Sequence, residues 1–340
     1  MLPNPLNCSH SYVLAHSASI HGAHAVQLLF AFSSILVISI GCCRLEQPRN
    51  RASCFRIHSG LRIIFGAGLG FGLLLCVSGV VLRSHDFINA LRNRPLCAYI
   101  WPSIHCLAAR LPISTGVLGL NLIVVSLLVE RWTATFCNSF YARHNRLLGI
   151  GLVAFVMTTT IFLLYYIYHN EDLNQTRAYC MATSMTSNPK MIRVMIVFVF
   201  LNLSTASGGI YLFSVSKDRM KCRNIDYTLE KSLELNENYL TLQLVAPLAV
   251  VHFLIFLLYA VAFLSVRIIT QKMDVIQTVS LIQWAYVINF VHPTIVAAFG
   301  FRLRSQLLSR RAEWLVNTND QTEIYFAMFD ALIDSNPRNY

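Results

Sequence analysis

Seven stretches of about 20 apolar residues, separated by polar segments, dominate this sequence. A helix of that length crosses the hydrocarbon layer of a bilayer, which is roughly 30 Å thick, whereas a buried helix of a soluble protein rarely needs so long an apolar run. The predicted spans are 24–43, 63–82, 107–128, 147–168, 192–215, 245–266 and 275–299. The sequence therefore predicts an all-α integral membrane bundle of seven transmembrane helices.

The charged residues support a membrane protein rather than a nucleic-acid-binding one. Only 13% of the residues are charged, against about 25% in typical soluble proteins. The net charge of +11 could indicate a nucleic-acid partner. However, the basic residues lie in the short segments between apolar runs, as membrane topology requires. We therefore expect the lipid bilayer, and no nucleic acid, as a partner.

The distribution of Lys and Arg predicts the orientation. With the N-terminus outside, the cytoplasmic segments 44–62, 131–146, 216–244 and 300–340 hold 18 basic residues and the outer segments hold 7. Positive residues favour the cytoplasmic side. We expect a multi-pass protein of the plasma membrane with its N-terminus outside. The first 20 residues show no cleavable signal pattern, so the first run is expected to be retained.

The predicted topology divides the chain into four parts. These are an extracellular N-terminus (1–23), the transmembrane domain (24–299), an amphipathic helix on the inner membrane surface (300–315) and a cytoplasmic tail (316–340). The surface helix is expected because apolar residues alternate there with arginines, which suits an anionic leaflet. Asn7 and Asn174 begin Asn-x-Ser/Thr sequons on the predicted outer side and are candidate glycosylation sites.

The third predicted span has a cysteine at its outer end and an arginine at its inner end. Cys106 precedes Arg131 by 25 residues, or ~37 Å of helix, so the two lie at opposite membrane surfaces. A thiol at the outer end can form a disulfide in an oxidising compartment. Cys180, in the loop between spans four and five, is the favoured partner. Cys97 and Cys8 are alternatives, and a free thiol is another.

Glu130 and Arg131 stand at the cytoplasmic boundary of the same span. An acid beside an arginine there can form a switchable ion pair, and breaking it would free the arginine for a partner protein. The simpler interpretation is that the pair marks the helix end and that Arg131 reaches the lipid headgroups.

A polar stripe follows Cys106 along the span. Arg110, Ser114 and Asn121 fall with Cys106 within roughly 80° of one another at 100° per residue, so the stripe should face the bundle interior. These residues, with Gln283 in the seventh span, are candidates for a ligand pocket. For Arg110 the alternative is a structural ion pair or bonds to loop carbonyls, because a charge at that depth requires a partner.

Two groups of residues resemble a known family. The first comprises Cys97, Cys106, Arg110-Leu111-Pro112 and Glu130-Arg131-Trp132-Thr133-Ala134-Thr135-Phe136. The second precedes the sixth span and comprises Leu229, Glu237 and Asn238, although Leu233 and Glu234 stand where Tyr-Gln is usual. The chain resembles rhodopsin-like receptors in general and, over residues 20–312, the nematode serpentine chemoreceptors of the Sra superfamily, class ab.

The resemblance implies a G-protein-coupled chemosensory receptor. Such a receptor binds an external small molecule and activates a heterotrimeric G protein, here through Glu130 and Arg131. It also implies a location in sensory neurons, in their cilia. The seventh span lacks the Asn-Pro-x-x-Tyr motif of rhodopsin-like receptors and instead reads Asn289-Phe-Val-His-Pro293. Details of the activation switch therefore do not carry over.

Signatures of enzymes and metal sites are absent from the sequence. It contains no glycine-rich phosphate loop, no Cys-x-x-Cys pair and no His-Glu-x-x-His. We expect no catalytic residues, no cofactor and no metal, with His252 and His292 packed and hydrogen-bonded. The alternatives to a receptor are a seven-span transporter or ligand-gated channel, or a membrane scaffold without a ligand.

Overall fold

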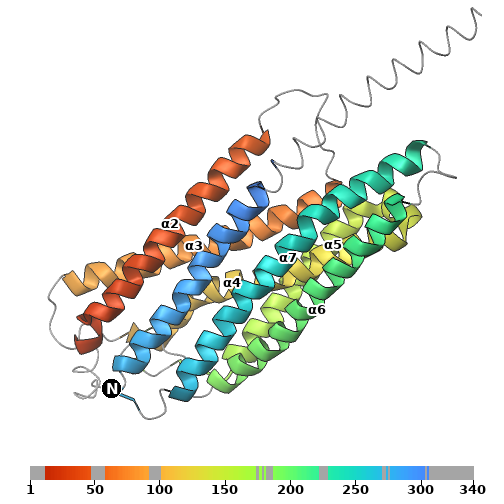
Figure 1. Ribbon diagram of the computed structural model, residues 1–340. Coiled ribbons are helices and arrows are strands. Elements are labelled where there is room, and N and C mark those ends of the chain that lie inside the picture. Colours follow the sequence, from red (N-terminus) through yellow and green to blue (C-terminus); the bar gives the residue numbers. More distant parts are fainter. Residues whose placement is uncertain are drawn as a thin grey trace, which may run out of the picture.

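A computed structural model describes residues 12–46, 58–91, 101–173, 176–177, 180, 187–221, 229–269, 273–274, 276–302 and 305. Seven helices in these ranges are long and apolar enough to cross a membrane (Figure 1). They are α2 (Ala18–Glu46), α3 (Ser59–Leu91), α4 (Ser103–Phe136), α5 (Asn138–Tyr168), α6 (Asn188–Lys221), α7 (Leu229–Ile269) and a helix at Ile276–Arg302, called the last helix below. The predicted seven-helix membrane bundle is confirmed.

Most helices extend beyond the predicted apolar runs. α7 begins at Leu229 rather than at residue 245, and α5 begins at Asn138 rather than at 147. Hydropathy marks the section that contacts hydrocarbon, whereas the backbone hydrogen bonds of a helix continue into the headgroup region and water. The cytoplasmic segment 131–146 was expected to be a loop from residue 133 onwards, and this is corrected, because Cys137 alone separates α4 from α5.

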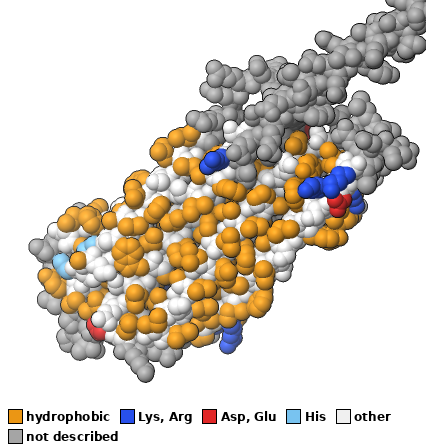
Figure 2. All heavy atoms as spheres, in the orientation of Figure 1, with side chains coloured by type: hydrophobic (Ala, Val, Ile, Leu, Met, Phe, Trp, Pro, Cys, Tyr) orange, Lys and Arg blue, Asp and Glu red, His pale blue; other side chains and the backbone are white. Residues whose placement is uncertain are grey.

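α4 lies at the centre of the bundle and contacts α3, α5, α6 and α7. Half of its most apolar window is buried, compared with 17% for α5. The outward face of α5 exposes large apolar side chains: Leu147, Ile150, Phe155, Ile161, Phe162 and Tyr165. Figure 2 shows hydrophobic side chains along the side of the bundle and charged ones towards its ends. An apolar surface of this extent suits lipid rather than water.

Small residues allow two helix pairs to approach closely. A Cβ atom on Gly149 of α5 would lie 2.6 Å from the Cα of Gly60 on α3, and one on Gly116 of α4 would lie 2.7 Å from the Cβ of Leu75. Membrane helices associate through such contacts because lipid supplies no hydrophobic force between them. These glycines set how closely α3 packs on α4 and α5.

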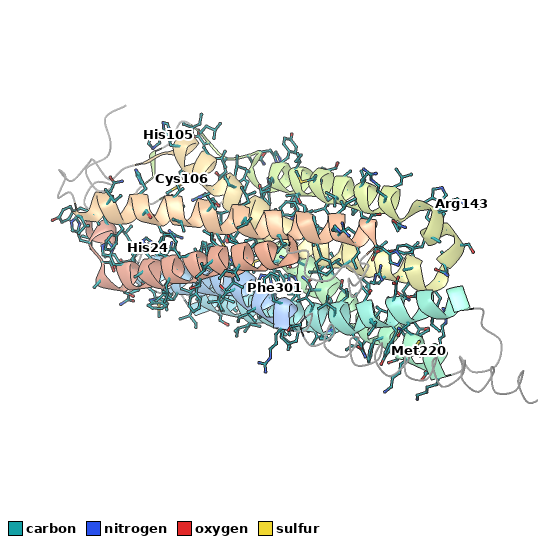
Figure 3. All side chains as sticks on the ribbon, turned by 90° about the horizontal axis from the view of Figure 1, so that it is seen from above. His24, His105, Cys106, Arg143, Met220 and Phe301 are labelled. Carbon is teal, nitrogen blue, oxygen red and sulfur yellow. A yellow bond between two sulfur atoms is a disulfide. The ribbon has the colours of Figure 1, made fainter. Side chains whose placement is uncertain are left out.

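The bundle has two chemically distinct ends, at opposite ends of α4. Figure 3 shows His105 and Cys106 near one end and Arg143 and Met220 near the other. We name them the Cys106 end and the Arg131 end. At the Cys106 end, β1 (Trp101–Pro102) pairs antiparallel with β2 (Thr176–Arg177).

Several predicted features fall outside the described residues. They are Asn7, Asn174 and the tail at 316–340. The proposed surface helix at 300–315 is described only at residues 300–302 and 305, and the predicted N-terminal segment only from residue 12. These features stay predictions.

Candidate functional site

At the Arg131 end, α4 carries two opposite charges that are both fully buried. Glu130 and Arg131 each have 0% of their surface exposed. Arg131 donates from Nε to Oε2 of Glu130 and from Nη2 to Oε1, each at 2.5 Å. This two-pronged geometry is the strongest way for arginine to bind a carboxylate. It compensates both charges for the loss of water, which a lone buried charge could not tolerate.

Tyr141 of α5 is hydrogen-bonded to both residues of this ion pair. Its hydroxyl accepts a hydrogen bond from Nη2 of Arg131 at 2.8 Å and donates one to Glu130. The guanidinium carbon also lies 5.5 Å from the centre of the Tyr141 ring, within the range of a cation–π interaction. Because only Cys137 separates the two helices, α5 turns back at once and brings Tyr141 against α4.

Asn238 links the pair to α7. Nη1 of Arg131 donates to its Oδ1 at 3.2 Å, and its Nδ2 donates to Oγ1 of Thr135 at 3.0 Å. Arg219 of α6 donates to the backbone oxygen of Thr135 at 2.7 Å. Side chains from α4, α5, α6 and α7 thus form one connected set, the Arg131 network, comprising Glu130, Arg131, Thr135, Tyr141, Arg219 and Asn238.

The Cys106 end is held together by a disulfide. Cys106 is bonded to Cys180, with their Cα atoms 5.1 Å apart, which is the pairing that the sequence favoured. Nε of Arg110 donates to the backbone oxygen of Cys180 at 2.5 Å, and its Nη1 lies 3.7 Å from Oε1 of Glu171. Arg110 therefore contacts the segment between α5 and α6, as the structural interpretation of this residue expects.

The other candidate pocket residues lie in different helix contacts. Ser114 shares a 2.9 Å hydrogen bond with the hydroxyl of Tyr168 on α5. Asn121 accepts a 2.7 Å bond from Nδ2 of Asn202 on α6. The backbone oxygen of Gln283 on the last helix accepts a 2.7 Å bond from Gln27 on α2. Of the four candidates, Asn121 lines the central pocket described next, and contact of any of them with a ligand stays a prediction.

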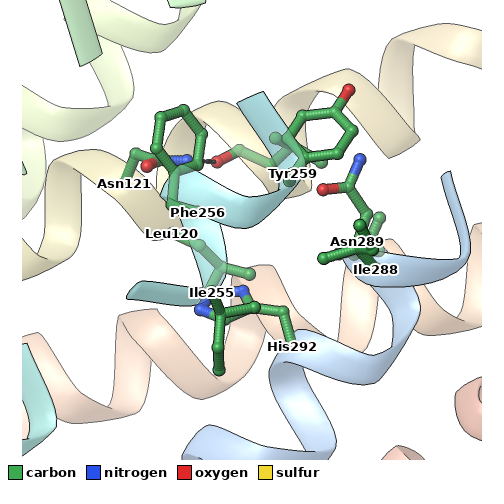
Figure 4. Close-up of a pocket in the computed structure, with 10 residues that line it drawn as sticks. Leu120, Asn121, Ile255, Phe256, Tyr259, Ile288, Asn289 and His292 are labelled. Atoms are coloured by element: carbon green, nitrogen blue, oxygen red, sulfur yellow. Dashed lines mark hydrogen bonds between the residues drawn. The ribbon is translucent and has the colours of Figure 1, made fainter. Parts of the chain in front are cut away.

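A pocket lies in the middle of the bundle (Figure 4). Its polar lining comes from Asn121 of α4, Tyr259 of α7, and Asn289 and His292 of the last helix, and its apolar lining includes Leu75 of α3. Atoms leave about 280 Å³ unfilled there, including space open to solvent. His292 also makes a 2.8 Å contact with His252.

Reasoning from sequence missed several of these residues. Tyr141 lay in the expected loop, and Arg83 was placed outside the second span, although both are fully or almost fully buried. An arginine directly after an apolar run was the available signal for Arg83. Asn238 was noted in the family resemblance without a role, because its contact with Arg131 spans 107 positions in the chain.

Comparison with known proteins agrees with this architecture. The family model for serpentine type 7TM GPCR receptor class ab chemoreceptors matches residues 6–334. Serpentine receptor class beta-17 of Caenorhabditis elegans is 25% identical over 222 residues, which cover 64% of this chain and 61% of that receptor. Serpentine receptor class alpha-1 of the same organism is 21% identical over 235 residues, covering 67% and 70%. The chain thus spans less than two thirds of the class beta-17 receptor.

The match to the class ab model covers nearly the whole chain and agrees with the observed bundle of seven membrane-length helices. It also confirms the resemblance read from Cys106, Arg110 and the Glu130-Arg131 motif. This multi-pass membrane protein belongs to the class ab family of serpentine seven-transmembrane chemoreceptors.

Proposed function

We propose that this protein is a chemosensory receptor that binds an external small molecule and activates a heterotrimeric G protein. The observation that carries the proposal is the Arg131 network, in which a fully buried arginine at the end of α4 is held by Glu130, Tyr141 and Asn238. The family membership supports a receptor of this kind.

The network suits a closed state that opens when α7 moves. Asn238 is the contact from α7 to both Arg131 and Thr135. Displacing α7 from α4 would break these two hydrogen bonds and uncover the guanidinium. Each bond to a charged group contributes about 1.5–3 kcal/mol, so a modest input is enough to shift the equilibrium. A ligand supplies that input only through its different affinity for the two states.

The ligand would enter from the Cys106 end. There the disulfide and Arg110 hold the segment between α5 and α6 against α4. The candidates Arg110, Ser114, Asn121 and Gln283 lie between that end and the middle of the bundle, and Asn121 reaches the central pocket. Closure of the helices around a ligand at this depth would act on α7 and the last helix.

The proposed topology places the Cys106 end outside the cell and the Arg131 end in the cytosol. The receptor would lie in the plasma membrane, in sensory neuron cilia, with Asn7 and Asn174 glycosylated. An epitope tag before residue 1 should be accessible to antibody on intact cells, and one after residue 340 only after permeabilisation. Both tags on the same side would contradict the topology.

The coupling test uses the full-length receptor co-expressed with heterotrimeric G proteins. A screen of small molecules should yield a compound that stimulates nucleotide exchange without an ion current. Arg131→Gln should abolish the response, whereas Arg143→Gln, which removes an exposed charge from the same end, should leave it unchanged. A ligand-evoked current without exchange would instead support the channel.

A further inference from the structure

Polar side chains on three neighbouring helices are buried inside the bundle near the Cys106 end. Arg83 of α3 is fully buried, and its Nη1 lies 3.2 Å from Nε2 of His24 on α2 and 3.5 Å from Oδ2 of Asp86. One turn further along α2, Gln27 donates to the backbone oxygen of Gln283 on the last helix at 2.7 Å. We call these five residues the Arg83 cluster.

Donors in this cluster lack acceptors among the described residues. Nε and Nη2 of Arg83 have no hydrogen-bond partner there, and neither has Nε2 of Gln283. Both side chains are 0% exposed. A buried donor without an acceptor costs about 1–3 kcal/mol, and more when it is charged. Native proteins rarely leave such groups unpaired unless they serve a ligand, an ion or water.

The geometry of the unpaired atoms selects the kind of acceptor. Nε and Nη2 lie on one edge of the guanidinium plane, and their parallel N–H bonds match the two oxygens of a carboxylate. The contact with Asp86 uses Nη1 instead, at a distance of 3.5 Å, which is at the limit of a hydrogen bond. The unpaired edge of Arg83 therefore has the two-pronged geometry that binds an anionic group.

The surrounding charges favour the same ligand class. Three arginines lie towards the Cys106 end, namely Arg83 of α3, Arg110 of α4 and Arg267 in the last turn of α7. Asp86 and Glu171 offset part of this positive field. A field inside the bundle is screened less than one in water, so an anion there would be attracted more strongly than at the surface.

The position suits a ligand that enters from the Cys106 end. At 1.5 Å per residue, Arg83 and Gln283 lie roughly 10 Å along their helices from that end. Asn289, six positions after Gln283, lines the central pocket together with the apolar side chains of Leu75, Ile255 and Phe256. An anionic head at the cluster would leave an apolar chain directed towards this pocket.

We propose that Arg83 and Gln283 bind the anionic group of a small organic acid, with the carboxylate on the Nε–Nη2 edge of Arg83 and within reach of Nε2 of Gln283. The inference rests on the proposed receptor function for its biological meaning, and it names the ligand class. Binding itself requires no G protein.

The test compares hexanoate with the matched neutral compound hexan-1-ol on the purified full-length receptor in lipid nanodiscs. Thermal unfolding is followed by intrinsic fluorescence. Hexanoate should raise the unfolding midpoint of the wild type more than hexan-1-ol does. Arg83→Gln should weaken the apparent affinity for hexanoate by about tenfold or more, because a hydrogen bond to a charged group is lost.

Two conservative variants keep the proposal testable if Arg83→Gln fails to fold. Arg83→Lys keeps the charge without the planar edge, and Gln283→Met keeps the side-chain size without the donor, so each should reduce the advantage of hexanoate over hexan-1-ol. Arg193→Gln is the control, because it removes an exposed charge at the start of α6 and should keep the full effect.

Three results would overturn the proposal. They are equal effects of hexanoate and hexan-1-ol on the wild type, an undiminished hexanoate effect in the Arg83 and Gln283 variants, or an equal loss in Arg193→Gln. Hexanoate binding without any G-protein activation would instead contradict the proposed function and leave this site intact. G-protein activation by neutral ligands alone, without hexanoate binding, would contradict the proposed anion site and leave the proposed receptor function intact.

Discussion

Nη1 of Arg131 donates a 3.2 Å hydrogen bond to Oδ1 of Asn238, which ties the end of α4 to the start of α7. Glu130, the preceding residue of α4, accepts hydrogen bonds from Nε and Nη2 of the same guanidinium, so all three nitrogens of Arg131 are hydrogen-bonded.

Asn238→Ala should raise ligand-independent G-protein activation, because it removes the contact from α7 to both Arg131 and Thr135. Asn238→Asp should lower it, since a carboxylate binds the guanidinium more strongly than an amide does. Nucleotide exchange without ligand, normalised to surface expression, measures both. Asn236→Ala, two positions away on α7, is the matched control. Equal basal activity in all three variants would show that Asn238 does not hold the receptor in its closed state.

Glu130→Gln should destabilise the receptor by about 3–5 kcal/mol, because it leaves the charge of Arg131 buried without its counter-charge. Thermal unfolding in nanodiscs measures the loss. Glu237→Gln serves as the comparison, since Glu237 is partly exposed and lies 3.8 Å from His58, a contact of about 0–1 kcal/mol. Similar losses in the two variants would show that Glu130 is not a buried ion-pair partner.

Gly149→Ala should destabilise the bundle by about 1–3 kcal/mol, the usual cost of overpacking. Its new Cβ would meet the backbone of Gly60 at 2.6 Å, and backbone cannot swing aside as a long side chain can. Gly151→Ala, two positions away on α5, meets nothing within 4 Å and should be neutral or slightly stabilising. Unfolding midpoints compare them, and an unaffected Gly149→Ala would mean that α3 and α5 pack less closely.

Cys180→Ser should cost about 4 kcal/mol in the chain-entropy model, because the disulfide closes a loop of 74 positions. Arg110→Gln should cost less, since it removes a bond to the same loop segment. The double variant should lose less stability than the sum of the single losses, because both residues hold one segment. A double-mutant cycle in thermal unfolding tests this, and strict additivity would argue that Arg110 acts independently of the loop.

Local sequence determined the seven spans, because a helix must contain an apolar run long enough to cross the hydrocarbon layer of the bilayer. It also determined that Cys106 and Arg131 lie at opposite ends of one helix, since helical rise converts spacing into distance. The predicted loop at 133–146 was wrong for a related reason: polar residues there end the contact with hydrocarbon but do not end the helix.

Only the tertiary structure decided which polar groups meet. Asn238 reaches Arg131, and Gln283 lies beside Gln27, through the rotation and packing of helices that are far apart in the chain. Hydropathy carries no information on that rotation, because it records how apolar a helix is and not which neighbour each face meets. The same limit applies to Arg83: its place directly after an apolar run was the available signal, but its burial with an unpaired edge depends on how the helices pack.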